Sequence, residues 1–506
     1  MTDTTQAEAV TAKSAVQAVD ELLRGVERAA WGVRGWVDAA NHTKHSWGRE
    51  LSDVRRTATR RKRELSSESQ RALSTGRMLL ALVSSYRWFG IRSAWLSRDR
   101  AARDLQRLHA ANAERFAAAS IEHGGALLKV GQLLSARRDL LPAVWTDQLA
   151  VLCDQVPAAP EAEARALLDR ELSDSQRASL LSIEWPPVAA ASIGQVHRAR
   201  FQSGDTEQLA ALKLQRPGIG GRVALDLELL ELVADALASS LPPMDHATIV
   251  RELRATVMAE LDYRAEAAAM QRAHARFADH AGVRVPAPIA ALCTERVLVS
   301  EWVEGKPLVE ALDRAQAAGD HGLVSSVLER LLSAYVEQIL LHGEFQADAH
   351  PGNFLVTDAG ELVLLDFGCV RRLEPSKRRA FGRIFADLLT GDAGGVAGQL
   401  AELGFRTQSG RPDTLLHFAE SMLGDLRGAL AGSEWPDLDQ VAARARELLS
   451  AAQADPVVAI PAEFVMIGRV FASLGGLFLH YRPEIDMSKA ILPHLSALAL
   501  ETAQAA

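Results

Sequence analysis

Residues 345–368 read FQADAHPGNFLVTDAGELVLLDFG, and this segment gives the strongest indication of the fold. Two short apolar runs flank a turn that contains an aspartate and a glycine, a pattern typical of a β-hairpin. Asn353 stands before the first run and Asp366 directly after the second, so a hairpin brings these two side chains together. Asp348 lies on the loop that leads into the first strand.

These side chains place two carboxylates and an amide oxygen at one location. Oxygen ligands of this kind hold Mg²⁺ on phosphates, and a carboxylate can accept the proton of an attacking hydroxyl. The spacing D-x-x-x-x-N followed by D-F-G is a kinase pattern. We therefore predict that Asp366 and Asn353 are metal ligands and that Asp348 is the base or water-positioning group. His350 is expected to cap or pack the loop.

A lysine partner for the phosphates is expected on a strand. Lys213 lies in the apolar run 209–215, and it would reach the α- and β-phosphates of a nucleotide. Burying a lysine alone is costly, so this position predicts a carboxylate partner. Glu260 and Glu266 are the candidates on a helical stretch expected over residues 223–275. Their helical phase allows only one of them to pair, and Glu266 is favoured.

Composition and charge narrow the class of protein. The 506 residues are 48% hydrophobic and 24% charged, which is the mixture of a soluble globular protein. The net charge of -8 gives no indication of nucleic-acid binding. The three cysteines, Cys153, Cys293 and Cys369, are far apart, so neither a zinc site nor a disulfide framework is expected. A reducing, cytoplasmic setting fits this pattern best.

Membrane contact is expected to be peripheral at most. The chain begins without the basic and apolar regions of a signal peptide. Residues 78–89 are too short to span a bilayer, and residues 464–479 contain an arginine and several glycines, so both are expected to be buried core helices. The expected location is the cytoplasm, and peripheral contact with the inner face of the membrane is a further expectation.

A basic run at residues 55–63 has two interpretations. The favoured one is a solvated helix face or linker. The alternative is contact with anionic lipid, helped by the nearby Trp88, Phe89 and Trp95.

The pattern along the chain predicts an α+β protein. Residues 1–105 are expected to form a helical N-terminal region, and 106–180 a helical extension. Residues 181–305 are expected to form a small sheet with inserted helices, and 306–506 a helical part with one hairpin. Three apolar runs in the third segment read as strands, namely 196–201, 209–215 and 296–302.

Three further motifs resemble those of the UbiB/AarF family of atypical kinases. Residues 129–132, KVGQ, resemble its K-x-G-Q motif, and residues 189–192, AAAS, resemble its Ala-rich loop. Residues 260–262, ELD, match its E-x-D motif. The segments around Asp348 and Asp366 match its catalytic and metal motifs, so five motifs occur in the family order over roughly residues 110–480.

The resemblance implies a two-lobed protein-kinase-like fold of the α+β class, with the helical N-terminal extension packed over the active site. It implies ATP or ADP with Mg²⁺ as ligands, slow ATPase activity, and a role in quinone or other isoprenoid-lipid metabolism, with a quinone-like ligand. Lys129 and Gln132 would face the nucleotide, with Lys129 near Glu260 or Asp262. The implied nucleotide-site residues are Lys129, Gln132, Ala189, Ala190, Ala191, Ser192, Lys213, Glu260, Asp262 and Glu266.

Some features depart from an ordinary protein kinase. No long activation segment follows residues 366–368, which argues against a peptide substrate. Alanine methyls in place of loop glycines crowd the phosphates and predict a preference for ADP or slow turnover. Gln346 stands where many relatives have histidine, with an expected effect on loop packing.

Two alternatives from other functional classes remain open. The first is a nucleotide-responsive binding or scaffold protein at a membrane or a biosynthetic complex. The second is a small-molecule phosphotransferase of the aminoglycoside or choline kinase kind, because those enzymes share the D-x-x-x-x-N pattern.

Overall fold

This computed structural model describes the part of the chain after residue 66, with gaps. The described residues are 67–93, 95–135, 141–153, 158–237, 251, 254–255, 257–417, 419–420, 455, 457–459 and 461–504. The basic run 55–63 and the rest of the expected N-terminal helices up to residue 66 lie outside them. The chain divides into two compact units: the first combines the residues up to Ala199 with Leu212–Leu261, and the second combines Arg200–Ala211 with the residues from Asp262 onward.

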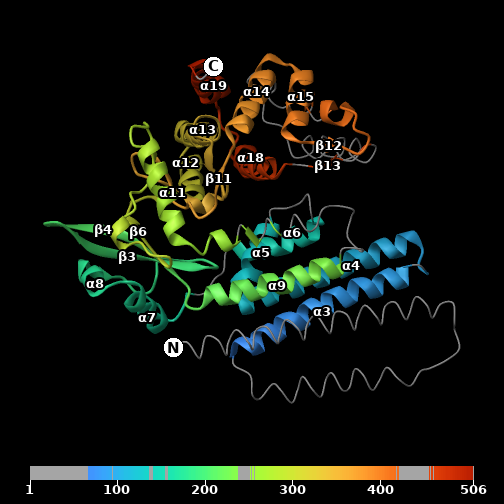
Figure 1. Ribbon diagram of the computed structural model, residues 1–506, viewed down its shortest axis with the longest axis horizontal. Coiled ribbons are helices and arrows are strands. Elements are labelled where there is room, and N and C mark those ends of the chain that lie inside the picture. The colour runs from blue at the N-terminus through green and yellow to red at the C-terminus, as the bar shows by residue number, and fades with distance from the viewer. Residues whose placement is uncertain are drawn as a thin grey trace. The chain divides into compact units, whose positions relative to one another are not determined.

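Helices dominate the first unit, and several of them pack side by side around one apolar core (Figure 1). In α3, Leu79, Leu82 and Val83 recur at helical spacing and are buried, which explains why this segment forms a helix against its neighbours. The packed helices are α3 (Ser67–Ser93), α4 (Arg98–His123), α5 (Gly125–Ser135), α6 (Ala143–Ala150) and α9 (Ile219–Leu237). The 3-10 turn η1 (Val151–Cys153) joins this core, and α7 (Glu161–Glu171) and α8 (Asp174–Ser179) follow.

A five-stranded sheet has the order β1-β3-β4-β6, with β2 paired to β3. The boundary between the two units passes through β3 and β4. Gly204 adopts a positive φ of 59° in the tight turn between these two strands, where a side chain would be strained. The strands expected at 196–201, 209–215 and 296–302 are confirmed. The members are β1 (Leu180–Ile183), β2 (Ala189–Ala190), β3 (Gly194–Ser203), β4 (Thr206–Gln215) and β6 (Val297–Glu301).

The second unit has its own apolar core, formed by helices and short strands. Its helices are α11 (Tyr263–Arg276), α12 (Leu308–Ala317), α13 (His321–Glu337), α14 (Pro375–Thr390), α15 (Ala393–Leu403), α18 (Ala462–Tyr481) and α19 (Met487–Gln504). Shorter turns are η3 (Ala290–Leu292), the π-helical η4 (Gln338–His342) and η5 (Pro351–Asn353). One sheet has the order β5-β10-β9-β7, with β5 (Val283–Arg284), β7 (Lys306–Pro307), β9 (Phe354–Val356) and β10 (Leu362–Leu364). Two strand pairs complete it: β8 (Glu344–Gln346) with β11 (Val370–Arg372), and β12 (Arg406–Thr407) with β13 (Val457–Ala459).

The α+β class is confirmed, but two expectations about individual elements are wrong. Residues 223–275 are not one helical stretch, because Asp262 caps the N-terminus of α11 and accepts hydrogen bonds from the backbone amides of Arg264 and Ala265. Glu260 therefore does not share a helix with Glu266. The segment from residue 306 onward also contains strands outside the expected hairpin, since β7, β8 and β11 are short strands whose apolar runs are too brief to show a period.

The two apolar segments, residues 78–89 and 464–479, lie in the helices α3 and α18 as expected. Within the described ranges, no helix has the length and apolar character needed to cross a bilayer.

Candidate active site

The hairpin at the centre of the candidate site has the expected register. Strands β9 and β10 pair antiparallel, with Leu362 opposite Val356 and Leu364 opposite Phe354. The Leu365 amide donates to the Asn353 carbonyl at 3.0 Å, so the pairing continues to the residue that precedes Asp366. The structure therefore brings the Asn353 and Asp366 backbones to the same end of one hairpin.

The loop before the hairpin is held by local hydrogen bonds. The Asn353 Nδ2 atom donates to the Asp348 carbonyl at 3.0 Å. This bond orients the amide so that its oxygen is the atom able to ligate a cation. The His350 Nδ1 atom accepts from the Gly352 amide at 3.1 Å, which confirms the capping role expected for His350. Ser473 on α18 donates to the Ala349 carbonyl at 2.7 Å and ties this loop to the helical core.

Asp366 is held from two sides. Its Oδ1 atom accepts from the Gly368 amide at 2.8 Å, which fixes the orientation of the carboxylate. Its backbone carbonyl accepts from the Gln346 Nε2 atom. The Gln346 side chain is 1% exposed, and its Oε1 atom accepts from the Tyr335 hydroxyl at 2.8 Å. Gln346 thus acts on the position of Asp366, a connection that the sequence did not reveal.

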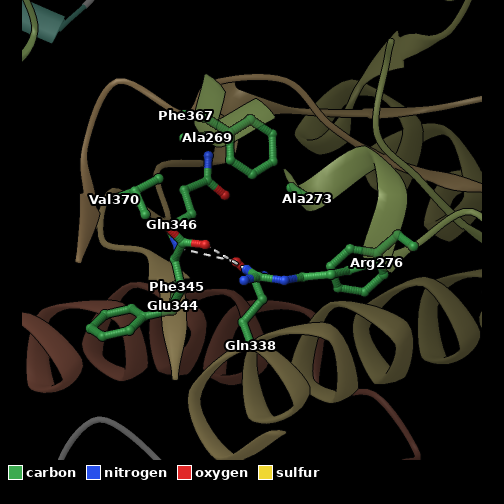
Figure 2. A pocket seen from close by; sticks show the side chains of 10 residues that line it. Ala269, Ala273, Arg276, Gln338, Glu344, Phe345, Gln346, Phe367 and Val370 are labelled. Carbon is green, nitrogen blue, oxygen red and sulfur yellow. Dashed lines mark hydrogen bonds and ion pairs between the residues drawn. The ribbon is translucent and has the colours of Figure 1, made fainter. Parts of the chain in front are cut away.

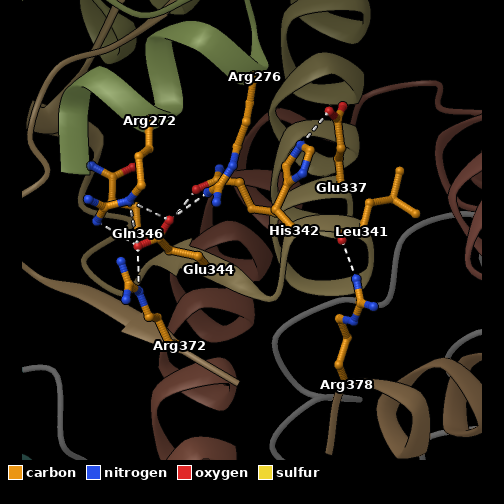
Figure 3. Close-up of polar contacts among 10 residues, drawn as sticks. Arg272, Arg276, Glu337, Leu341, His342, Glu344, Gln346, Arg372 and Arg378 are labelled. Carbon is orange, nitrogen blue, oxygen red and sulfur yellow. Dashed lines mark hydrogen bonds and ion pairs between the residues drawn. The ribbon is translucent and has the colours of Figure 1, made fainter. Parts of the chain in front are cut away.

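A buried carboxylate next to this loop forms ion pairs with three arginines (Figure 3). Glu344 is 6% exposed on its side chain and accepts from Arg272 and Arg276 of α11 at 2.7 Å each, and from Arg372 of β11 at 2.9 Å. Burial alone would raise the pKa of Glu344, but the hydrogen bonds from the three arginines outweigh it and lower the pKa to about 2. Glu344 therefore joins α11 to the strands on either side of the Asp348 and Asp366 segments. In the sequence, the spacing of Arg272 and Arg276, one helical turn apart, was the signal that could have indicated this cluster.

A small pocket lies beside this cluster (Figure 2). It contains about 250 Å³ of empty space, part of it open to solvent. Its lining residues are Ala269, Ala273, Arg276, Phe277, Gln338, Glu344, Phe345, Gln346, Phe367 and Val370. Asp348, Asn353 and Asp366 are not among them, although the lining residue Gln346 donates to the Asp366 carbonyl.

In the first unit, the K-x-G-Q segment is anchored by each of its three defining residues. The Lys129 Nζ atom lies 2.8 Å from Glu260 Oε1, with side chains 13% and 16% exposed, which confirms the proximity expected of this pair. A Cβ at Gly131 would lie 2.4 Å from Leu152 Cδ1, so a larger residue there would force the buried Leu152 side chain to shift. The Gln132 Nε2 atom donates to the Leu152 carbonyl at 2.8 Å. The amide group of Gln132 therefore has a structural partner in η1.

The Ala-rich segment is a tight hairpin in the same unit. Ala189 pairs with Val196 and Ala190 with Gln195. The Ala191 amide donates to the Gly194 carbonyl at 2.7 Å, so this amide is used inside the hairpin. Ser192 is buried.

The hairpin is braced by a buried histidine. His197 Nδ1 lies 2.9 Å from the Glu184 carbonyl, and only a protonated nitrogen can donate to that oxygen. His197 Nε2 then accepts from Gln195 Nε2 at 2.8 Å, while Gln195 Oε1 accepts from the Ala159 amide at 2.8 Å. Burial lowers the pKa of His197, which agrees with the neutral tautomer that these contacts require.

The other predicted site residues, Lys213, Asp262 and Glu266, are divided between the two units. Lys213 is half-buried on β4 in the first unit, and Glu266 is 3% exposed on α11 in the second. Their pairing, and the role of Lys213 on the phosphates, stay predictions. Asp262 is exposed and caps α11, so the structure gives it a role in helix initiation.

Comparison with known proteins gives matches over much of the chain. A family model described as the ABC1 atypical kinase-like domain matches residues 151–400. The Arabidopsis thaliana protein ACTIVITY OF BC1 COMPLEX KINASE 8, chloroplastic, is 31% identical over 404 residues, covering 73% of this chain and 52% of the relative. A Synechocystis protein, slr0889, is 35% identical over 293 residues, covering 56% of this chain and 71% of the relative.

A solved structure extends the likeness to the fold. The complex of Rv3197 with erythromycin from Mycobacterium tuberculosis is 26% identical and has a TM-score of 0.52, covering 79% of this chain and 99% of that one. By contrast, the chain spans about half the length of the plant relatives, with 52% and 53% covered in two of them. The expected kinase-like α+β fold is confirmed by these matches.

Proposed function

This chain belongs to the ABC1 family of atypical kinase-like proteins, and from that premise we propose that it binds ATP or ADP with Mg²⁺ and slowly transfers or hydrolyses the terminal phosphoryl group. The observation that carries the proposal is the hairpin that brings Asn353 and Asp366 to one end, with Asp348 on the attached loop. Two carboxylates and an amide oxygen on one rigid element suit a hard cation bound to phosphates.

Each residue has a distinct proposed role. Asp366, oriented by the Gly368 amide, and Asn353, oriented by the Asp348 carbonyl, would hold Mg²⁺, which supplies charge neutralisation on the phosphates when bound. Asp348 would accept the proton of the attacking hydroxyl or position a water molecule. Lys213 on β4 would contact the α- and β-phosphates.

Slow turnover without a protein substrate is part of the proposal. Only the short strand β11 lies between Gly368 and the start of α14 at Pro375, which leaves little chain for docking a peptide. The Ala191 amide already donates to Gly194, which supports weaker phosphate contact than a glycine loop provides. We propose that this activity supports quinone or other isoprenoid-lipid metabolism and takes place at the inner face of a membrane.

The test is ATP consumption by the purified 506-residue chain, with and without vesicles and a quinol head-group mimic. Slow ATP hydrolysis that Asp348→Asn abolishes, with nucleotide affinity retained, is the expected result. Nucleotide binding without turnover in any condition would instead favour the second candidate, a nucleotide-responsive binding protein, which the occupied Ala191 amide also supports.

A small-molecule ligand has one specific observation in its favour. The similar Mycobacterium protein was solved in complex with erythromycin. Adding erythromycin to the same assay, with an aminoglycoside and choline as controls, separates the candidates. Efficient phosphate transfer to one of these compounds would replace the ATPase proposal with a small-molecule phosphotransferase.

A further inference from the structure

Two polar side chains at the base of the Ala-rich hairpin, which β2 forms with the start of β3, are completely buried. Gln195 is 1% exposed and His197 is 0% exposed, and both lie on β3. Gln195 is the residue that pairs with Ala190 in the hairpin. A buried polar group costs free energy unless its hydrogen bonds are made, so the partners of these two side chains bear on the position of the hairpin.

The two side chains form a chain of hydrogen bonds whose direction is fixed at both ends. The Ala159 backbone N–H can only donate, so Gln195 Oε1 accepts from it, and the Gln195 Nε2 atom then donates to His197 Nε2. The Glu184 carbonyl can only accept, so the proton of His197 is on Nδ1. All three bonds are made in one protonation state, in which His197 is neutral.

This chain of hydrogen bonds cannot accept a second proton on His197. That proton would set an N–H on Nε2 against the Gln195 NH2 group. Turning the Gln195 amide over would give His197 an acceptor, but it would set the NH2 group against the Ala159 N–H. Either arrangement opposes two buried donors, so protonation must break a contact between the hairpin and the segment that contains Ala159.

The charged groups around His197 do not remove this conflict. Glu161 and Arg165 of α7 act on the imidazole in opposite directions, and they lie 2.7 Å from each other as an ion pair. The Glu184 carboxylate lies 3.9 Å from Arg198. Burial lowers the pKa of His197 from its usual 6.5, so the neutral form prevails at neutral pH and protonation requires acidic solution.

The tip of the hairpin is held separately, by Arg216. Its backbone amide donates to the Ile193 carbonyl at 2.8 Å, and its Nε atom donates to the Ala191 carbonyl at 2.9 Å. Arg216 follows directly after β4, the strand that carries Lys213, and all of these residues belong to the first unit. The hairpin is therefore fastened to the end of β4 at its tip and to the Gln195 chain of hydrogen bonds at its base.

We infer that Gln195 and His197 are positioning residues of the nucleotide site, which fix the Ala-rich hairpin relative to Lys213 only while His197 is neutral. The inference rests on the proposed nucleotide binding, because the hairpin is one of the segments assigned to that site. Contact between a loop backbone and phosphates depends on where the loop lies, so nucleotide affinity should fall when this chain of hydrogen bonds breaks.

The first measurement needs no nucleotide. Amide hydrogen exchange of residues 188–195 in the 506-residue chain, compared with free peptide at each pH, should show roughly fivefold less protection at about pH 5.5 than at about pH 7.5. His197→Gln keeps an acceptor for Gln195 and does not titrate, so its protection should be equal at both pH values. Gln195→Glu can accept from both Ala159 and a protonated His197, so its protection should be equal or greater at the lower pH.

The second measurement is calorimetric titration with Mg²⁺–ATP at the same two pH values. The parent should lose roughly fivefold more affinity than His197→Gln on going to the lower pH. His274→Gln is the matched control, because His274 Nδ1 also lies 2.8 Å from a backbone carbonyl, that of Val285, in the second unit. This control should keep the parent's response to pH in both measurements.

The outcomes distinguish this inference from the proposed function. Nucleotide binding at neither pH would remove the proposed function, while hydrogen exchange would still decide whether His197 holds the hairpin. A parent and a His197→Gln variant with the same response to pH, in either measurement, would overturn the inference. Thermal unfolding at about pH 7.5 shows which variants fold, and if His197→Gln does not, the opposite response of Gln195→Glu decides.

Discussion

The Lys129 ammonium lies 2.8 Å from the Glu260 carboxylate and links α5 to the segment just before α11. Both side chains are largely shielded from solvent, at 13% and 16% exposure, so removing one partner leaves the other charge poorly solvated. In the first unit this ion pair joins two motifs that are far apart in the sequence.

The ion pair predicts a non-additive pair of substitutions. Lys129→Met and Glu260→Gln should each lower the free energy of unfolding by roughly 1–3 kcal/mol, because each leaves the other, largely shielded charge without its partner. The double variant should lose less than the sum of the two single losses. Denaturant unfolding of all four proteins measures this coupling, and strictly additive losses would mean that the contact contributes nothing.

Gly131 predicts a steric defect. Gly131→Ala would place a methyl 2.4 Å from Leu152 Cδ1, and overpacking of this kind costs about 1–3 kcal/mol. Gly468→Ala on α18 is the matched control, because a Cβ there has no neighbour within 4 Å and alanine favours a helix. Thermal unfolding should show a lower Tm for the first variant and an equal or higher Tm for the second.

Asp366→Asn should weaken Mg²⁺-dependent nucleotide binding by removing an anionic ligand. The asparagine keeps an oxygen that can still accept from the Gly368 amide, so the loop should keep its shape. Calorimetric titration with Mg²⁺–ATP should show a loss of about tenfold or more in affinity. Affinity equal to that of the parent would remove Asp366 from the metal site.

Gln346 should make the orientation of Asp366 insensitive to pH. Its side chain donates to the Asp366 carbonyl and accepts from Tyr335, and it does not titrate. Gln346→His should therefore bind Mg²⁺–nucleotide like the parent at a pH of about 8 and lose affinity below about 6.5, where a cation appears near the metal site. Gln346→Met, which lacks both hydrogen bonds, should be weak at every pH. A flat profile for the histidine variant would contradict this role.

Glu344 predicts where the protein is acid-sensitive. Its pKa is lowered from 4.5 to about 2 in the folded state, so its stabilising contribution is complete above pH 4.5 and is lost as the pH falls toward 2. The contribution is roughly 2–3 kcal/mol, discounted because the Arg372 side chain is 68% exposed. Glu344→Gln should lower the free energy of unfolding at neutral pH and reduce its dependence on pH between 4.5 and 2. Asp413→Asn, in an exposed pair with Arg411, should leave this dependence unchanged.

Part of the candidate site was predictable because its geometry is local. Asn353 and Asp366 flank two strands joined by one turn, and β-hairpin pairing alone brings them together. The capping role of His350 follows from contacts within two residues. The break before α11 could have been found from Asp262 as a helix N-cap, but the helix-favouring residues on both sides masked that signal.

The family, the α+β class, the hairpin and the spacing of Asp348, Asn353 and Asp366 could all be predicted from the amino-acid sequence, because each depends on a motif or on neighbouring residues. Tertiary structure alone decided that Gln346 holds the Asp366 backbone, and that Glu344 gathers arginines from α11 and β11. It also placed the buried Leu152 side chain where a Cβ at residue 131 would meet it. These contacts join segments distant in the chain, and which buried polar groups meet depends on how helices and strands pack, a property that no local pattern encodes.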